Sequence, residues 1–299
     1  MFGLNRRLDR VQGRRPRFVR RKPIIKTLCA TVGFSDVTSA NIVGYHNDDL
    51  DTDGMQFKAA SFTTIGVVDA EENPCVRLSD LRITGYEEAP GYCMKGDVWI
   101  DMLNPDGSIQ TDEDGNDIQY NWQDWGGAGE WLDAEGNTIE NPEEITFAVG
   151  TGLNLNVQYG CEEWAKLASS GEIYTDSLTI PLVTDGQNYV GNPLARTITL
   201  DEIAITGYEE DPGYCMKGDV WIDMLNPDGS IQTDEDGNDI QYYWQDWGGA
   251  GEWLDTDGNP IENPEEIAFE IGDGLDLNVQ YGCEEWAAIK FPALVPVAE

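Results

Sequence analysis

The chain contains two nearly identical copies of one long segment. Residues 83–164 align without a gap to residues 205–286, and 72 of the 82 paired positions are identical. A repeat of this length corresponds to a whole folding unit, and a unit of about 120 residues can bury a core of its own. The duplication therefore predicts two similar domains in tandem.

The similarity continues upstream of the strong repeat and sets the expected domain limits. The segment "TDGMQFKAASFTTIG" at residues 52–66 aligns loosely with "TDGQNYVGNPLARTITL" at residues 184–200. The expected units are a basic arm (1–27), a first β domain (28–168), a near-duplicate second β domain (169–289) and a C-terminal tail strand (290–299).

Apolar residues alternate along each domain with the period of two that is typical of half-buried strands. In "DVWIDML" Val98 and Ile100 share one face, and in "DIQYNW" Ile118, Tyr120 and Trp122 share one face. Further strands are expected at residues 145–149, 153–159, 177–183 and 196–200.

Turn signals such as "NPDG", "DEDGND" and "DAEGN" are dense between these strands, and only "GCEEWAKLAS" at residues 160–169 has a helical pattern. Asp-Gly and Asn-Pro pairs at this spacing are typical of proteins built from short strands. The sequence predicts an all-β fold with two tandem, homologous β-sandwich or barrel-like domains behind a basic N-terminal arm.

Charge is divided unevenly along the chain. Ten of the 18 Lys and Arg residues lie between Arg6 and Lys26, which leaves the arm near +9 and the rest near −47. Such an acidic body repels nucleic acid, anionic lipid and its own copies unless cations or a basic partner intervene. Nucleic acid is therefore expected only at the arm. No apolar run reaches about 18 residues, so no membrane span is expected.

The arm has three interpretations that the residues leave open. It binds a neighbouring acidic body in an assembly, it binds nucleic acid, or it is a leader that is processed. The residues that would make the assembly contact are Arg14, Arg15, Arg17, Arg20, Arg21 and Lys22.

The six cysteines form an even set that the duplication sorts into pairs. The simplest pairing joins Cys93 to Cys161, Cys215 to Cys283 and Cys29 to Cys75. These bridges would indicate an oxidising compartment, and the alternative is that some cysteines are buried free thiols.

Oxygen-bearing side chains cluster in one loop of each repeat, which suits a hard cation such as calcium. The candidate ligands are Asp106, Asp112, Asp114, Asn116 and Asp117, with Asp228, Asp234, Asp236, Asn238 and Asp239 as their copies. The alternative is that the Asp-Gly pairs and the asparagines beside them make tight turns, and that the carboxylates face water.

All ten tryptophans lie in the strong repeats. Trp122 shares a face with apolar neighbours and is expected in the core. The candidates for an exposed platform that stacks on a glycan are Trp125 and Trp131, with their copies Trp247 and Trp253.

Catalytic signatures are scarce. His46 is the only histidine and lies in the turn-like "GYHNDD", where a solvated loop residue is expected. The sequence has no CxxC pair and no phosphate-binding loop motif. We therefore expect a protein that is not an enzyme.

The segments "TSANIVGY", "GMQFKAASF", "VRLSDLRITGY", the hairpin "YNWQDW" to "EWLD" and the closing "FAVGTGLNLNV" occur in this order. Together they resemble a family of uncharacterised secreted bacterial β-repeat proteins. That resemblance implies an extracellular β-repeat protein and supplies no site residues.

The tail segment "FPALVPVAE" weakly echoes "DSLTIPLVT" at residues 176–184. It either pairs within its own domain or adds to a sheet edge of the next subunit. The leading hypothesis is a structural subunit that forms a homopolymer through arm and tail, in a filament or shell outside the cell, on its surface or on a virion. The alternative is a tandem carbohydrate-binding or adhesion protein.

Overall fold

The computed structural model describes residues 30–31, 43–50, 54–59, 62–63, 67–68, 74–85, 97–104, 108–124, 129–158, 161, 165–182, 186–207, 219–226, 230–245, 251–280 and 287–294. Within these residues the chain forms antiparallel strands, turns and short 3-10 helices, without an α-helix. The all-β prediction is therefore confirmed.

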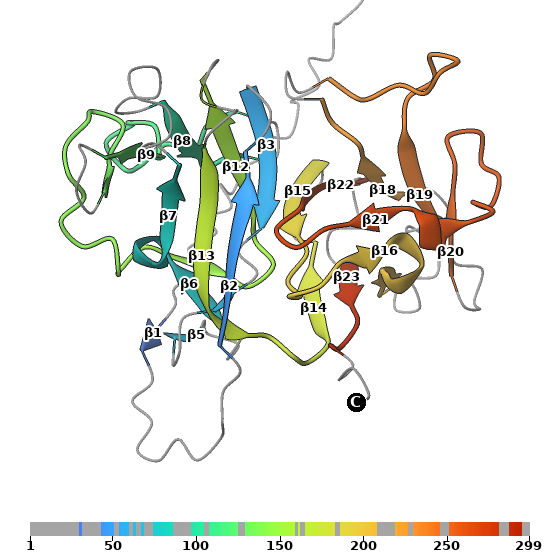
Figure 1. Ribbon diagram of the computed structural model, residues 1–299. Helices are drawn as coiled ribbons and strands as arrows, with labels where there is room; N and C mark the ends of the chain where they lie inside the picture. The colour runs from blue at the N-terminus through green and yellow to red at the C-terminus, as the bar shows by residue number, and fades with distance from the viewer. Residues whose placement is uncertain are drawn as a thin grey trace, which may run out of the picture.

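Repeat one is built from the first thirteen strands (Figure 1). They are β1 (Ala30–Thr31), β2 (Val43–Asp49), β3 (Gly54–Ala59), β4 (Phe62–Thr63), β5 (Val67–Val68), β6 (Cys75–Arg77), β7 (Leu81–Thr84), β8 (Val98–Asp101), β9 (Gln119–Gln123), β10 (Glu130–Leu132), β11 (Thr146–Ala148), β12 (Gly152–Val157) and β13 (Lys166–Ile173), with the 3-10 helix η1 (Leu78–Asp80) before β7. The larger sheet has the order β10-β9-β8-β12-β3, and the smaller sheet pairs β13 with β2, β4 and β7. The pairs β1-β5 and β6-β11 are separate.

Repeat two follows the same plan with fewer strands. They are β14 (Leu178–Pro181), β15 (Gly186–Gly191), β16 (Ile198–Thr199), β17 (Ala204–Thr206), β18 (Val220–Asp223), β19 (Gln241–Gln245), β20 (Glu252–Leu254), β21 (Ala268–Phe269), β22 (Gly274–Val279) and β23 (Ala288–Phe291), with the 3-10 helices η3 (Leu200–Glu202) and η4 (Pro264–Glu266). The larger sheet has the order β15-β22-β18-β19-β20, the smaller sheet has the order β14-β23-β17, and β16 pairs with β21.

Each repeat is a sandwich that buries a core between its larger and smaller sheets. In repeat one, Ile83 and Leu167 of the smaller sheet pack in one cluster with Ile100, Leu155 and Trp122 of the larger sheet. Repeat two has its own cluster, built from equivalent residues. The period-two pattern of the sequence therefore predicted the buried faces correctly, including Trp122, which is 3% exposed.

The amide of Ala165 donates to the carbonyl oxygen of Cys161 at 2.8 Å, as in a helical turn, but the expected helix at residues 160–169 is wrong from Lys166 onward, where β13 begins. Its residues pair on both sides, with β2 from Lys166 to Glu172 and with β7 from Lys166 to Ser169. Pairing on both edges outweighs a local helical pattern. The strand also crosses the expected limit at residue 168, so sheet pairing extends repeat one through Ile173.

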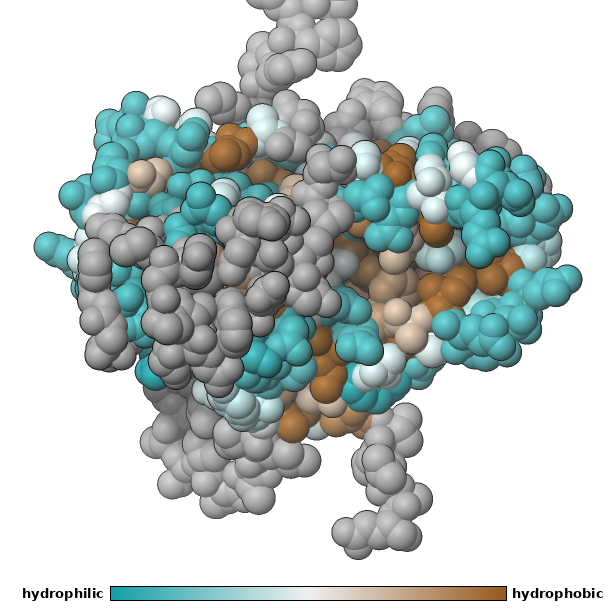
Figure 2. Space-filling view, turned by 45° about the horizontal axis from the view of Figure 1, so that its top comes forward, coloured by the Kyte–Doolittle hydropathy of each residue, from teal (hydrophilic) through white to brown (hydrophobic). Residues whose placement is uncertain are grey.

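The start of the tail packs within repeat two. Phe291 is fully buried and pairs with Leu178 of β14, while the amide of Leu294 donates to the carbonyl oxygen of Thr175 at 2.9 Å. The home-pairing alternative therefore applies to residues 290–294, and residues 295–299 lie outside the described residues. Hydrophilic side chains cover most of the described surface seen in Figure 2. No described helix has the length and hydropathy that crossing a bilayer requires.

Candidate functional site: the junction between the repeats

The repeats meet along β3 and β15, which are edge strands of their larger sheets and lie side by side at the centre of Figure 1. Two isolated β-bridges connect the repeats, one between Lys58 and Asp273 and one between Thr151 and Val190. Lys58 aligns with Val190, and Thr151 aligns with Asp273. Interchanging the repeats therefore converts one bridge into the other.

The backbone hydrogen bonds of the junction show the same equivalence. The amide of Ala59 donates to the carbonyl oxygen of Gly272 at 2.6 Å. The amide of Gly191, which aligns with Ala59, donates to the carbonyl oxygen of Gly150 at 2.9 Å. The junction is thus a pseudo-two-fold pairing of one repeat with its near-copy, of the kind found in isologous dimers.

An aromatic pair marks the pseudo-two-fold axis. Phe57 of β3 and Tyr189 of β15 occupy aligned positions, and their rings stack with centroids 5.0 Å apart and planes 10° apart. Offset stacking of this kind contributes about 0.5–1.5 kcal/mol beyond the buried area.

Two glycines allow the backbones to approach. A Cβ atom on Gly152 would lie 2.9 Å from the backbone carbonyl carbon of Tyr189, and one on Gly274 would lie 2.6 Å from that of Phe57. Because backbone cannot move aside as a flexible side chain can, only glycine fits at these aligned positions.

One half of the junction is apolar. Val149 is 3% exposed and packs with the core of repeat two. The following turn at Gly150, with φ of 81°, is so close that an added Cβ would lie 2.5 Å from Cδ1 of Ile180 and 3.1 Å from Cδ2 of Leu178. This half therefore joins the repeats by burial of aliphatic side chains.

The other half is charged. His46 and Asp48 occupy the positions that align with Leu178 and Ile180, and they face the turn at Gly272. His46 lies in β2, so the expected solvated turn at this residue is wrong. Its Nε2 atom is buried and has no hydrogen-bond partner within the described part of the chain.

A lysine links the acidic groups of the charged half. Nζ of Lys58 lies 3.2 Å from both carboxylate oxygens of Asp48 and 3.9 Å from Oδ1 of Asp273. Burial raises the pKa of Asp48 and the nearby Asp273 charge raises it further, while Lys58 opposes both. The lysine therefore holds two carboxylates of different repeats together.

A row of side chains crosses the axis on the face of the larger sheets that points away from the cores. It is polar on both sides of the central aromatic pair. Cross-strand pairing places its members in the order Gln119, Asp101, Asn154, Phe57, Tyr189, Asp276, Asp223 and Gln241. Residues at aligned positions of the two repeats therefore occupy equivalent places on either side of the axis, and only some of the residue types differ.

In repeat one the carboxylate of this row is fully satisfied. Asp101 accepts hydrogen bonds from Nε2 of Gln119 at 2.6 Å, Nδ2 of Asn156 at 2.9 Å and Nε1 of Trp99 at 3.2 Å. Buried polar groups that are satisfied in this way rigidify a sheet.

Repeat two replaces Asn154 by a second acid, Asp276, directly across from Asp223. Asp223 accepts from Nε2 of Gln241 at 2.7 Å and Nδ2 of Asn278 at 2.6 Å. Asp276 is 1% exposed and accepts from Nε2 of Gln187 at 2.9 Å. Its Oδ1 atom has no partner among the described residues.

The two carboxyl groups influence each other's protonation. Burial and then the Asp223 charge raise the pKa of Asp276 to about 7, against the hydrogen bond from Gln187. Burial also raises the pKa of Asp223, against the hydrogen bond from Gln241. Asp276 therefore binds a proton as the pH falls through about 7, which Asn154 at the aligned position of repeat one cannot do.

The loop at Asp112 that was predicted to bind calcium is held by its own hydrogen bonds. The Asp112 carboxylate accepts from the amides of Asp114 and Asn116, each at 2.9 Å, and these bonds lower its pKa. Gly115 has φ of 88° in the same turn. The same Asp-x-x-Gly-Asn turn recurs at Asp133, Asp234 and Asp255.

The loops form tight turns, and Asp117 and Asp239 close them through β-bridges to Thr111 and Thr233. Within the described residues, no three His, Cys, Asp or Glu side chains are grouped to hold a metal ion. Asp106 and Asp228 lie outside the described residues. Calcium binding remains a prediction.

The expected glycan platform is wrong for Trp131 and Trp253, which are 3% and 4% exposed. Nε1 of Trp131 donates to the carbonyl oxygen of Leu81 at 3.0 Å, and Nε1 of Trp253 donates to that of Ile203 at 2.9 Å. Each indole joins the two sheets of its sandwich. Trp125 and Trp247 lie outside the described residues.

The predicted bridge between Cys93 and Cys161 is wrong in this structure. Cys161 is a buried thiol whose Sγ lies 3.8 Å from Oδ2 of Asp97. Cys75 is disulfide-bonded, as predicted for that residue. The other predicted disulfide residues, Cys29, Cys93, Cys215 and Cys283, lie outside the described residues, as do the arm residues.

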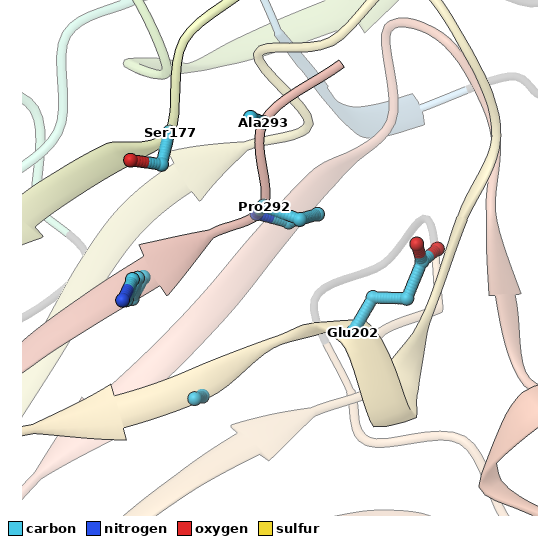
Figure 3. Close-up of a pocket in the computed structure, with 6 residues that line it drawn as sticks. Ser177, Glu202, Pro292 and Ala293 are labelled. Carbon is cyan, nitrogen blue, oxygen red and sulfur yellow. The ribbon is translucent and has the colours of Figure 1, made fainter. Parts of the chain in front are cut away.

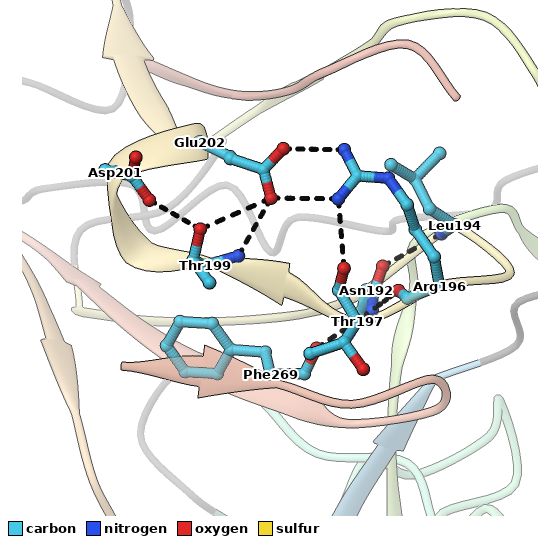
Figure 4. A network of polar contacts seen from close by, with 8 residues as sticks. All are labelled: Asn192, Leu194, Arg196, Thr197, Thr199, Asp201, Glu202 and Phe269. Atoms are coloured by element: carbon cyan, nitrogen blue, oxygen red, sulfur yellow. Dashed lines mark hydrogen bonds and ion pairs between the residues drawn. The ribbon is translucent and has the colours of Figure 1, made fainter. Parts of the chain in front are cut away.

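A polar network beside the junction fixes the segment that follows β15 (Figure 4). Asn192 is fully buried, and its Nδ2 donates to the carbonyl oxygens of Arg196 and Glu270 at 2.8 and 2.9 Å. Arg196 forms a bidentate pair with Glu202 at 2.9 and 2.7 Å, which lowers the pKa of that carboxyl.

An open groove of about 420 Å³ lies beside β23 (Figure 3). Its lining residues are Ser177, Glu202, Ala204, Lys290, Pro292 and Ala293. Glu202 already pairs with Arg196, so the groove offers few polar groups that converge on one point.

Sequence reasoning missed the junction residues. The alignment of β3 with β15 contained the signal, because Phe57 and Tyr189 are aromatic at aligned positions. No protein-family model, curated protein or solved structure matches the chain.

Proposed function

We propose that this protein is a non-enzymatic structural subunit of a self-associating assembly, such as a filament or shell, outside the cell, on its surface or on a virion. The observation that carries the proposal is the junction, in which one repeat binds its near-copy through equivalent contacts. A unit that binds a copy of itself can be used repeatedly to build an assembly.

The chemistry of the junction supports a structural role. Backbone hydrogen bonds from each edge strand to a turn of the other repeat, together with an aromatic stack, give a rigid contact. Asp101, the acid in the polar row of repeat one, is occupied by three hydrogen bonds from protein groups. Such satisfied groups stabilise a surface and leave few atoms to bind a substrate.

The charge of the body sets a condition on assembly. The part of the chain outside the arm has a net charge near −47 and repels its copies, so contacts between subunits require screening, cations or a basic segment. The arm, with a charge near +9, supplies such a segment, and calcium at the acidic loops would supply cations.

Negative-stain electron microscopy of the full-length protein tests this function. The grids are prepared over a series of protein concentrations, with calcium and then with a chelator. We expect ordered polymers or shells in at least one condition. Discrete two-lobed monomers in every condition would contradict the proposal, and polymers that survive the chelator would remove calcium from it.

A further inference from the structure

We infer that the surfaces that form the junction between β3 and β15 also bind a second copy of this chain. In that arrangement, repeat one of one molecule takes the place of the other molecule's repeat one and pairs with the other molecule's repeat two. This domain exchange deepens the proposed function and rests on it, since it names the surface through which the subunits associate.

The surfaces of the junction are complementary in any two copies of the chain. Its backbone contacts run through the amides of Ala59 and Gly191. Gly152 and Gly274 allow the close approach on either side of the axis. The repeat-one surface of any copy therefore offers repeat two the same contacts that its own repeat one offers.

The two cores are largely independent of each other. Each repeat buries its own cluster between its own sheets, and Val149 is the one residue of repeat one that belongs to the described cluster of repeat two. Opening the junction thus leaves both sandwiches intact. It uncovers the edge strands β3 and β15, which then need a new partner.

The connection between the repeats is short. Only Tyr174 to Ser177 separates β13 from β14, a span of at most about 14 Å when extended. The amide of Leu294 ties Thr175 to repeat two, and Tyr174 packs against the core of repeat two. The hinge therefore lies next to Ile173, and a short hinge is the usual site of domain exchange.

Charge sets when exchange occurs. The closed chain brings Lys58 between Asp48 and Asp273, and in an exchanged pair Lys58 and Asp48 of one molecule would face Asp273 of the other. Two acidic bodies approach more easily when salt screens them. We therefore expect exchange to increase with protein concentration and with ionic strength.

Cysteine trapping of full-length chains tests the exchange. Lys58→Cys and Asp273→Cys are made in separate chains, mixed, concentrated in salt and oxidised. In a closed monomer each new cysteine faces the native residue of its own chain. A disulfide between positions 58 and 273 of different chains, identified by peptide mass with one chain isotope-labelled, is the expected result.

A second pair guards against a folding defect caused by losing Lys58. Thr151→Cys mixed with Val190→Cys probes the aligned bridge in the apolar half. The double variant with both cysteines in one chain is the positive control, because it forms the bridge without exchange. Asp114→Cys mixed with Asp236→Cys, on exposed loops, measures random collision.

The outcomes separate the inference from the proposed function. Assemblies without interchain 58–273 or 151–190 bridges above the collision control would overturn the exchange and leave the assembly function standing. Exchanged dimers that never grow into larger assemblies would support the exchange and contradict the function. Absence of both bridges and assemblies contradicts both.

Discussion

Phe57 and Tyr189 stack across the pseudo-two-fold axis, with ring centroids 5.0 Å apart and planes 10° apart. They stand at aligned positions of two repeats, so the contact is one that a repeat makes with its own near-copy. Phe57 pairs across its sheet with Asn154, and Tyr189 pairs with Asp276. The aromatic stack therefore connects the polar rows of both repeats.

The stack is predicted to couple the repeats energetically. We expect Phe57→Ala and Tyr189→Ala to be non-additive, with a coupling free energy of about 0.5–1.5 kcal/mol. Urea unfolding of the two single variants and the double variant measures it. Phe57→Tyr is the control that keeps the stack. A coupling free energy of zero would show that the rings do not interact in solution.

Gly274→Ala is predicted to open the junction, because its Cβ would lie 2.6 Å from the backbone carbonyl carbon of Phe57. Overpacking of this kind costs about 1–3 kcal/mol. We expect faster hydrogen exchange at the amides of Ala59 and Gly191, measured by NMR. Gly237→Ala is the comparison variant, because its φ of 84° strains an alanine locally while nothing lies within 4 Å of its Cβ, so it costs stability away from the junction. Equal rates of amide hydrogen exchange in both variants would contradict the close approach of the two backbones at Gly274.

Asp276 is predicted to make repeat two more stable in acid. Its pKa of about 7 in the fold lies above the ordinary 3.8, so the folded state binds the proton more tightly. The contribution of Asp276 to the free energy of unfolding then falls as pH rises from about 4 to about 7, by a few kcal/mol at most, and is constant above.

Exchanging the residue types between the repeats tests this slope. Asp276→Asn should flatten the dependence of the free energy of unfolding on pH and raise stability at pH 8. Asn154→Asp, the reciprocal change, should add a similar slope in repeat one, where Asp101 lies opposite. Denaturant unfolding between pH 4 and pH 8 provides the measurement. An unchanged slope in Asp276→Asn would refute the raised pKa of Asp276.

Trp131→Phe is predicted to destabilise repeat one by about 1–3 kcal/mol, because it leaves the buried carbonyl of Leu81 without its indole donor. Trp122→Phe is the matched control. Its indole packs edge to face on Trp131, but its Nε1 atom has no hydrogen-bond partner among the described residues. Equal losses of stability in thermal unfolding would mean that the Leu81 bond contributes nothing.

Periodicity and duplication predicted the fold because both depend on local patterns. The alternation of Val98 and Ile100 identifies the buried face of β8, and both residues are fully buried. Trp131 was misjudged because it is buried by packing against the other sheet of its sandwich, where the carbonyl of Leu81, fifty residues away, accepts its hydrogen bond. The helix expected at 160–169 failed for the same reason, since β2 and β7 decide the strand there.

The junction required the structure. The Asn154 and Asp276 difference is visible in the alignment as one of few substitutions, but only sheet register places Asp276 opposite Asp223. Likewise His46 reads as a turn residue until β2 pairs with β13, which turns its ring inward. Contacts between edge strands of different repeats leave no periodic signal in the sequence.

Sedimentation velocity of the unmodified full-length chain, over a series of protein concentrations at low and high salt, tests self-association most directly. The account predicts species heavier than the 33.2 kDa monomer that grow with concentration and with salt. A single monomeric species across the whole series would contradict it.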